Sequence, residues 1–393
     1  MINNFIFRKV RLDKFRILFL TFLFSVSFSN NFDKCIWVKA DSMIKEESIY
    51  DALIFAYEHE FNKVFLQVRS RGDSFYSSSI VPKNDLIDND FDPLKYALDL
   101  GHSLGLEVHA WVNTYILWSS PNKPSYPNHL YYTNPDWMEV NVHGKSDSSI
   151  DINAPQSLNW EGIFLSPNNP EVNNYLSSVF YELIDDYDID GLHFDYIRFQ
   201  DDIYGYNKIG RNIFEKKYGF DPFDIERNII SPKYGWSIAE IDSMKSIWSD
   251  YKTSNINSLV YKVRNRIDSL NKDIKISAAV KTNPLISKKK WSQDWKYWID
   301  EEIMDFVVTM NYDPSLINFS KNIESIRSEF SRYDFNKIIM GIAIYNQDAL
   351  EVSDKIYLSY IYNFKGISLF PYDRKKANTY WFNDILDVFQ IMD

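Results

Sequence analysis

The stretch 188–199, DIDGLHFDYIRF, carries the pattern that decides the fold. Gly191 opens a short run of large apolar residues and Asp195 closes it, which is typical of a strand buried in a parallel sheet. An amphipathic stretch precedes this run, at 170–187, and it begins with Asn169 followed by a proline, as helices often do. The segment therefore predicts a helix that leads into a buried strand with a carboxylate at its end.

The same alternation of short apolar runs and amphipathic stretches continues in both directions. Eight such units in sequence predict a (β/α)8 TIM barrel, an α/β fold, rather than an open doubly wound sheet. The strands are expected at 35–39, 64–68, 107–112, 191–195, 274–280, 306–310, 338–344 and 366–370. The helices are expected at 47–60, 93–103, 170–187, 207–218, 249–270, 292–302, 319–330, 349–362 and 374–386.

Two long insertions interrupt this alternation. Residues 118–167 follow the third expected strand, and residues 200–248, partly helical, follow the fourth. Both lie after the carboxyl ends of strands, where barrel enzymes build their active sites. Because no linker or change of composition divides the chain, we expect one barrel domain over residues 30–393.

The first 29 residues have the features of a secretory signal peptide. A basic start is followed by an apolar run at 17–28, which is too short to span a bilayer, and by the small-x-small pattern Ser27-Phe28-Ser29. An uncleaved anchor and a buried helix are the alternatives. We therefore expect an exported protein, periplasmic or extracellular, with no stable membrane span after cleavage. Cys35, close to the cleavage point, is expected to be a buried thiol in the first strand.

Composition excludes several classes of protein. With 45% hydrophobic residues among 393, the chain can bury a full core. The formal net charge of −11 argues against a nucleic-acid partner. A single cysteine excludes an intramolecular disulfide framework and a multi-cysteine zinc site. No glycine-rich nucleotide motif follows an expected strand, so we expect no cofactor and no resident metal.

Polar and aromatic side chains gather at the expected carboxyl ends of the strands. Sugar hydroxyls need groups that form several hydrogen bonds, and sugar C–H faces stack on aromatic rings, so this composition favours a carbohydrate cleft. Core or loop packing is the alternative for each aromatic residue alone. The expected substrate-binding residues are Arg69, Asn113, Tyr115, Trp118, His193, Arg198, Asn311, Tyr312, Tyr345 and Asp373.

Asp195 is the principal candidate for catalysis. A carboxylate at a strand end enters a barrel site partly desolvated, and its raised pKa suits a general acid. A structural ion pair with Arg198 or Arg69 is the alternative. His193 shares a strand face with Asp195, but a hydrogen-bonded interior histidine is an equally good interpretation.

Glycoside cleavage generally needs a second group that attacks the sugar or activates water. Asp313 is the first candidate for this second carboxylate, with Asp373 and Asp41 as fallbacks. Tyr312, next to Asp313, is expected to donate to a developing oxyanion or to an acetamido oxygen. Asp190 and Asp305, at the opposite ends of their strands, are expected to be structural.

From about Lys34 to Phe382 the chain resembles the glycosyl-hydrolase-10-like family. The resemblance implies a barrel glycosidase, and some bacterial relatives are associated with peptidoglycan glycan strands. The matching segments, in order, are 36–38, 65–69, 107–113, 165–172, 190–199, 293–295, 305–312 and 366–370.

The sequence departs from better-defined glycosidases at two points. True family 10 xylanases have a glutamate after strand four and another on strand seven, whereas here strand four ends in Asp195 and strand seven in Ile344-Tyr345-Asn346. The segment 190–195 is also similar to the chitinase-type pattern, whose acid glutamate would fall at Ile197. If chemistry is retained, Asp195 itself must supply the acid or the nucleophile, and assistance by a substrate acetamido group stays open.

The leading hypothesis is therefore hydrolysis of a glycosidic bond in a polysaccharide, with an N-acetylated cell-wall glycan as the candidate substrate. The main alternative is a non-catalytic glycan-binding barrel, favoured by the missing acid on strand seven. A metal-dependent hydrolase or deacetylase is a third alternative, because His109 and His193 are placed to meet inside the barrel. No histidine pair has H-x-H or H-E-x-x-H spacing.

Overall fold

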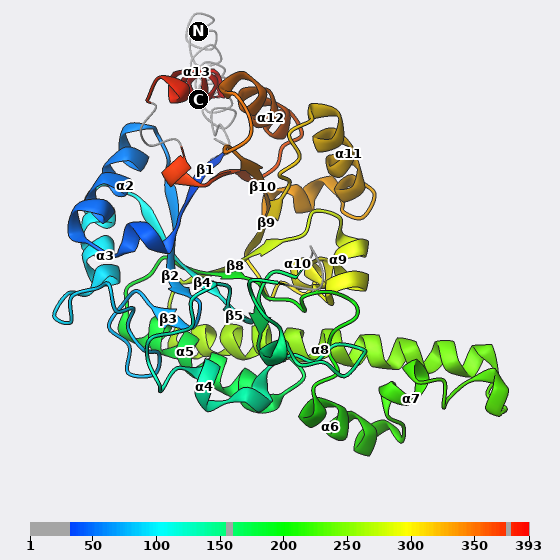
Figure 1. The fold of residues 1–393 in the computed structure, drawn as a ribbon. Helices are drawn as coiled ribbons and strands as arrows, with labels where there is room; N and C mark the ends of the chain where they lie inside the picture. The colour runs from blue at the N-terminus through cyan, green and yellow to red at the C-terminus, as the bar shows by residue number, and fades with distance from the viewer. Residues whose placement is uncertain (1–31, 155–159, 375–378, 393) are drawn as a thin grey trace, which may run out of the picture. The chain divides into compact units, whose positions relative to one another are not determined.

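A closed barrel of eight parallel strands forms the centre of the protein, as predicted (Figure 1). The computed structural model describes residues 32–154, 160–374 and 379–392. Each of the eight expected strands is present, with its ends shifted by no more than a few residues. The strands are β1 (Asp33–Val38), β2 (Lys63–Ser70), β4 (Glu107–Asn113), β7 (Gly191–Asp195), β8 (Lys275–Val280), β9 (Phe306–Met310), β10 (Ile338–Ala343) and β11 (Gly366–Phe370).

The barrel strands follow one another around the ring in sequence order, from β1 and β2 through β4 and β7 to β11. Pairing of β1 with both β2 and β11 closes the ring. A short strand β3 (Asp73–Ser74) adds to β2 in the antiparallel direction, outside the parallel ring. In the ring, Asn113 of β4 is the register partner of Asp195 of β7, so these two strand ends lie side by side.

Helices surround the barrel, as Figure 1 shows. Many begin at a side-chain cap that the sequence signals, such as Asn169 before α5 and Asp92 before α3. The surrounding helices are α2 (Glu46–Glu58), α3 (Pro93–Ser103), α5 (Pro170–Asp186), α8 (Ile238–Leu270), α9 (Pro284–Trp291), α10 (Trp295–Asp300), α11 (Leu316–Arg327), α12 (Ala349–Ile361) and α13 (Asn383–Met392).

The helix expected at 292–302 is shorter in the structure, and another helix, α9, precedes it. Ser292 takes a left-handed backbone conformation, with φ of 53°, which ends α9, and Asp294 then caps α10. The helix expected at 249–270 begins earlier, at Ile238, because Ser237 and Glu240 form a capping box there. Local capping chemistry set these boundaries.

Both long insertions are ordered into small elements over the part that the structure describes. The first contains a two-stranded antiparallel sheet, β5 (Ile116–Trp118) with β6 (Ile163–Phe164), and the helix α4 (Leu130–Thr133). The second contains α6 (Lys208–Tyr218) and α7 (Pro222–Glu226), which lie beside the part of α8 that extends away from the barrel in Figure 1.

Aromatic side chains fill much of the barrel interior. Trp37, Phe65, Trp111 and Phe306 are almost fully buried and belong to one cluster. Cys35 belongs to it too and is a buried free thiol, as expected. Such a filled interior makes a TIM barrel a packed core rather than a pore.

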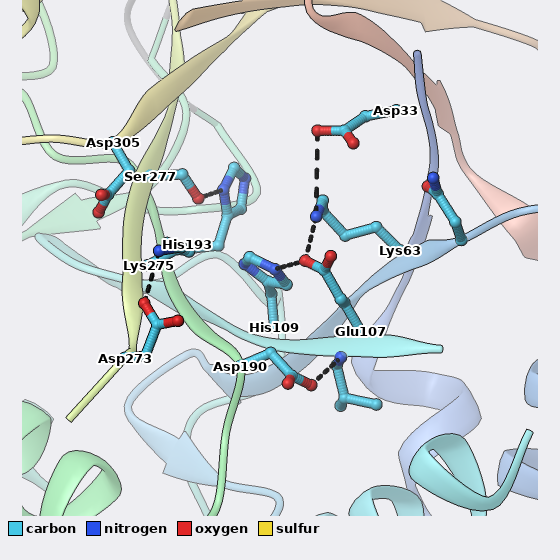
Figure 2. Close-up of polar contacts among 12 residues, drawn as sticks. Asp33, Lys63, Glu107, His109, Asp190, His193, Asp273, Lys275, Ser277 and Asp305 are labelled. Carbon is cyan, nitrogen blue, oxygen red and sulfur yellow. Dashed lines mark hydrogen bonds and ion pairs between the residues drawn. The ribbon is translucent and has the colours of Figure 1, made fainter. Parts of the chain in front are cut away.

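Charged residues gather where several strands begin, at the closed end of the barrel (Figure 2). Lys63 pairs with Glu107 and lies 3.9 Å from Asp33. Asp190 accepts the backbone N–H of Val108, 2.7 Å away. The contact with Val108 agrees with the structural role expected for Asp190. Asp305, likewise expected to be structural, accepts the N–H of Ile276 at 2.7 Å.

The predicted signal peptide, residues 1–29, lies outside the residues that the structure describes. Among the helices in the described part of the chain, none is both long and apolar enough to cross a membrane.

Candidate active site

Asp195 ends β7 at the open end of the barrel and is half-buried there. Its Oδ1 accepts the backbone N–H of Tyr196 at 2.7 Å. Among the described residues, none donates a hydrogen bond to its Oδ2. Burial raises the pKa of Asp195 to about 6, although the Tyr196 N–H and the cation of Arg198 act in the opposite direction. The carboxyl is therefore suited to hold and release a proton near neutral pH.

Three charged side chains share the electrostatic environment of Asp195. Arg198 and Lys281 lower its pKa, and Glu161 raises it. Nη2 of Arg198 lies 2.5 Å from Oε2 of Glu161, and Nζ of Lys281 lies 3.9 Å from Oε1 of Glu161. Two carboxyl groups and two cations thus meet at this side of the barrel mouth.

Lys281 is placed here by the segment that follows β8. Its backbone N–H donates to Oε1 of Gln293 at 2.9 Å, and its carbonyl accepts from Nε1 of Trp295 at 3.0 Å. Its ammonium lies over the ring of Trp291. Burial, together with the neighbouring Arg198, lowers the pKa of Lys281 to about 8.

An aromatic floor lies next to these charges. The half-buried rings of Tyr312 and Phe370 stack with centroids 5.4 Å apart, and exposed Tyr345 meets Phe370 edge-on at 6.4 Å. Tyr312 faces Asp195, whose charge contributes to raising the pKa of the phenol, after burial as the main cause. Partly exposed rings beside a protonatable carboxyl are suited to stacking against sugar C–H faces.

A polar cavity of about 450 Å³ opens on the same end of the barrel. Gln67 lines it and also donates through Nε2 to Oδ1 of Asn113, the register partner of Asp195. The cavity therefore neighbours the Asp195 strand end. Its lining includes Lys39, Asp41, Arg71, Asp73, Trp118 and Tyr126.

Asp313 lies apart from this group of charges. Its Oδ1 accepts the N–H of Ser315 at 2.9 Å, and both oxygens lie near Nδ2 of Asn318, at 3.4 and 3.3 Å. The carboxylate thus binds the start of α11. Of the two fallback candidates, Asp373 pairs with Lys39 at 3.0 Å and Asp41 is an exposed residue of the cavity lining.

Three of the expected substrate-binding residues make contacts that hold the scaffold together. Arg69 is fully buried and donates to the backbone carbonyl of Asn113. Tyr115, also fully buried, donates to Oδ1 of Asn173 at 2.8 Å. Asn311 donates to the carbonyl of Phe319 at 3.2 Å. These contacts connect strand ends to neighbouring loops and helices.

His193 lies in the barrel interior with zero exposure. Its Nε2 accepts from Nε1 of Trp37 at 3.2 Å, and its Nδ1 lies 2.8 Å from Oγ of Ser277. Both ring nitrogens therefore form hydrogen bonds within the protein, which agrees with the interpretation of His193 as an interior histidine. The rings of His193 and His109 both pack against the ring of Phe65. Within the described ranges, no three His, Cys, Asp or Glu residues group closely enough to hold a metal.

Arg198, Tyr312 and Tyr345 are the expected binding residues that the structure brings to the Asp195 side of the mouth. Asn113 lies beside Asp195 in register, and Trp118 lines the polar cavity. Sequence reasoning missed Glu161, because it lies in an insertion before β6 rather than at the end of a barrel strand. Lys281 directly follows the end of β8, so its position at a strand end could be predicted from the sequence, but its role could not.

Comparison with known proteins agrees with this geometry. The family model described as "Glycosyl hydrolase-like 10" matches residues 25–359. The glycosyl hydrolase DigH of Escherichia coli is 24% identical over 302 residues, which cover 69% of this chain and 59% of DigH. YngK of Bacillus subtilis, also a glycosyl hydrolase, is 23% identical over 279 residues, covering 64% of this chain and 46% of YngK. The chain thus matches only about half of the length of these curated relatives.

Among solved structures, the glycoside hydrolase domain of PgaB (BpsB) from Bordetella bronchiseptica superposes with a TM-score of 0.67 at 15% identity. The match covers 91% of this chain and 98% of that domain, which supports the barrel fold. Because the family model spans most of the sequence, from before β1 to α12, this chain belongs to the glycosyl hydrolase-like 10 family.

Proposed function

We propose that this protein hydrolyses O-glycosidic bonds in a polysaccharide, with Asp195 as the proton donor to the leaving oxygen. The observation that carries the proposal is the Asp195 carboxyl, which burial keeps protonated to about pH 6 and whose Oδ2 accepts no hydrogen bond from the described residues. General-acid catalysis requires a group of this kind beside the scissile oxygen.

The surroundings of Asp195 support a glycan as the substrate. Tyr312, Phe370 and Tyr345 offer ring faces and edges for stacking, and the polar cavity next to the Asn113 strand end extends the site along the mouth. A cavity of about 450 Å³ is within the range of small-ligand sites. We propose an N-acetylated cell-wall glycan as the substrate class. We also propose that the protein is exported and that its first 29 residues are a signal peptide.

The test is cleavage of a panel of glycans by the mature protein. The panel contains chitohexaose, bacterial peptidoglycan glycan strands and algal polysaccharides, with products identified by mass spectrometry. We expect Asp195→Asn to abolish cleavage while the melting temperature stays near that of the wild type. Asp313→Asn is the matched control, because that carboxylate binds the start of α11. Full activity of Asp195→Asn would remove the proposed mechanism.

A non-catalytic glycan-binding barrel is the second candidate function. The observation that favours it is the end of β10, which is followed by Ile344 and Tyr345 without an acidic residue. It predicts that the wild type binds chitohexaose or glycan strands without releasing products. It also predicts that Asp195→Asn binds these glycans as tightly as the wild type does.

A further inference from the structure

We propose that Glu161 is the second carboxylate of this site and accepts the proton of the water molecule that attacks the sugar. This inference rests on the proposed glycoside hydrolysis and names the partner that Asp195 needs there. It assigns the role to a loop residue of the first insertion, and not to Asp313 or to another residue that ends a barrel strand.

The first argument is proximity. The charge of Glu161 contributes to raising the pKa of Asp195, and both carboxyl groups interact with the same two cations, Arg198 and Lys281. Arg198 lies three residues after Asp195 and reaches Oε2 of Glu161 at 2.5 Å. No comparable link joins Asp195 to Asp313, whose oxygens contact Ser315 and Asn318.

The second argument is the way in which the chain fixes Glu161. Its backbone N–H donates to Oε1 of Gln200 at 3.2 Å, so the insertion after β7 holds it from one side. On the other side, buried Asp147 accepts from Nε1 of Trp160 and from the N–H of Phe164, each at 3.0 Å. A loop carboxylate is therefore held at both flanks, as preorganised catalysis requires.

Close backbone packing fixes the same segment. Gly162 has φ of +148°, and a Cβ added there would lie 2.5 Å from the carbonyl oxygen of Trp118. Only glycine allows the residue after Glu161 to lie this close to β5. The β5–β6 sheet therefore presents Glu161 in one defined position, although no barrel strand carries it.

The third argument is the division of charge. Burial favours the protonated form of Asp195, whereas Glu161 lies beside two cations, Arg198 and Lys281. Oε2 is engaged by Arg198 at 2.5 Å, and Oε1 has only the longer 3.9 Å pair with Lys281. Oε1 is thus the oxygen left to bind water. An acid and a base with opposite environments are what glycoside hydrolysis requires.

The reaction balances with these two groups. The bond between the anomeric carbon and the leaving oxygen breaks, and that oxygen takes the proton of Asp195. A water oxygen bonds to the anomeric carbon and gives its proton to Glu161. Exchange with solvent then restores both groups, and one water has been added across the bond. Attack by water from the opposite face predicts inversion of the anomeric configuration.

The experiment compares Glu161→Gln, Glu161→Ala and Glu171→Gln on the panel glycan that the wild type cleaves. Glu171 is the matched control, a carboxylate that accepts from Nε1 of Trp137 in the first turn of α5. We expect Glu161→Gln to lower kcat by about 100-fold or more, with little change in KM, because general-base catalysis contributes 10²–10⁴-fold. Glu171→Gln should keep the wild-type kcat.

Two further measurements separate catalysis from a merely structural role. Added formate or azide should restore part of the activity of Glu161→Ala, because a small anion fills the space of the lost carboxylate. A glycosyl fluoride, whose leaving group needs little protonation, should be hydrolysed by Asp195→Asn but not by Glu161→Ala. A purely structural Glu161 would give neither rescue nor this contrast between the two variants.

The outcomes distinguish the two proposals. If the wild type cleaves a glycan, Asp195→Asn is inert and Glu161→Gln keeps the wild-type kcat, the role of Glu161 is wrong and the proposed function stands. Loss of activity in Glu161→Ala without rescue by formate or azide also overturns it, because the loss is then structural. If the wild type cleaves no glycan on the panel, the proposed function fails and the role of Glu161 fails with it.

Discussion

Nε1 of Trp37 donates a hydrogen bond to Nε2 of His193 across the interior of the barrel, over 3.2 Å. An indole N–H is only a donor, so Nε2 must be the unprotonated nitrogen of the imidazole. The ring proton then lies on Nδ1 and is donated to Oγ of Ser277, 2.8 Å away. His193 is therefore neutral, with the proton on Nδ1. Figure 2 shows its contact with Ser277.

The first prediction concerns the charge of His193. Burial lowers the pKa of His193 well below its usual value of 6.5, and nearby His109 acts in the same direction. Between the folded and unfolded pKa values only the unfolded chain takes up this proton, so the contribution to stability is lost as the pH falls below about 6.5. ¹⁵N NMR of labelled histidine should show His193 as the neutral Nδ1–H tautomer from pH 8 down to pH 5.5.

Trp37→Phe provides the comparison. It leaves Nε2 of His193 buried without its donor, which should cost about 1–3 kcal/mol in the free energy of unfolding. A cationic His193 signal in the wild type at pH 5.5 would contradict the interpretation.

The second prediction concerns the pH dependence of activity. Asp195 must carry its proton to act as the acid, and burial raises its pKa to about 6, so kcat/KM should fall as the pH rises through about 6. Lys281 lowers this pKa by its charge. Lys281→Met should therefore move the alkaline limb of the kcat/KM profile to higher pH. Initial rates between pH 4 and 9 provide the measurement, and a shift to lower pH would exclude Asp195 as the titrating acid.

The third prediction concerns a buried carboxyl in the first insertion. Glu139 is fully buried, and burial raises its pKa to about 8 from 4.5. The unfolded chain loses this proton near pH 4.5, whereas the folded chain keeps it to about pH 8. Stability should therefore fall as the pH rises through this window, at a rate of about 1.4 kcal/mol per pH unit for the fully released proton.

Glu139→Gln removes this titration while keeping an acceptor for the N–H of Gly205, which Oε2 of Glu139 accepts at 2.7 Å. Urea unfolding at pH 5, 6.5 and 8 should show the variant gaining stability relative to the wild type as the pH rises. Glu171→Gln serves as the exposed comparison. A constant difference between Glu139→Gln and the wild type at all three pH values would refute the prediction.

The fourth prediction concerns the start of β7. A Cβ added at Gly191 would lie 2.0 Å from Nδ1 of His109, an impossible contact with a fully buried ring. We expect Gly191→Ala to lower the free energy of unfolding by about 1–3 kcal/mol or more, as overpacking of a core does. Gly101→Ala should cost less, because its Cβ would lie 2.5 Å from one methyl group of Val108, whereas a Cβ at Gly191 would lie within 2.8 Å of three ring atoms of His109. Equal destabilisation of the two variants in urea unfolding would contradict this prediction.

Much of the fold was predictable because its signals are local. The apolar run from Gly191 to Asp195 predicts a strand with the bounds that the structure has, and the other seven barrel strands were predicted to within a few residues. Burial on both faces makes each strand of a parallel barrel readable from its own residues. The boundaries that failed, at α8 and α9, depended on caps at Ser237 and Ser292.

By itself, the sequence determined the barrel and the position of Asp195 at a strand end, because strand alternation and helix capping act over a few neighbouring residues. Only the tertiary structure decided which groups surround that carboxyl. Glu161 meets Arg198 across 37 positions in the chain, and Trp37 meets His193 across 156. Such pairs depend on ring closure and on the β5–β6 sheet. No local pattern encodes which distant side chains are brought within hydrogen-bond distance by packing.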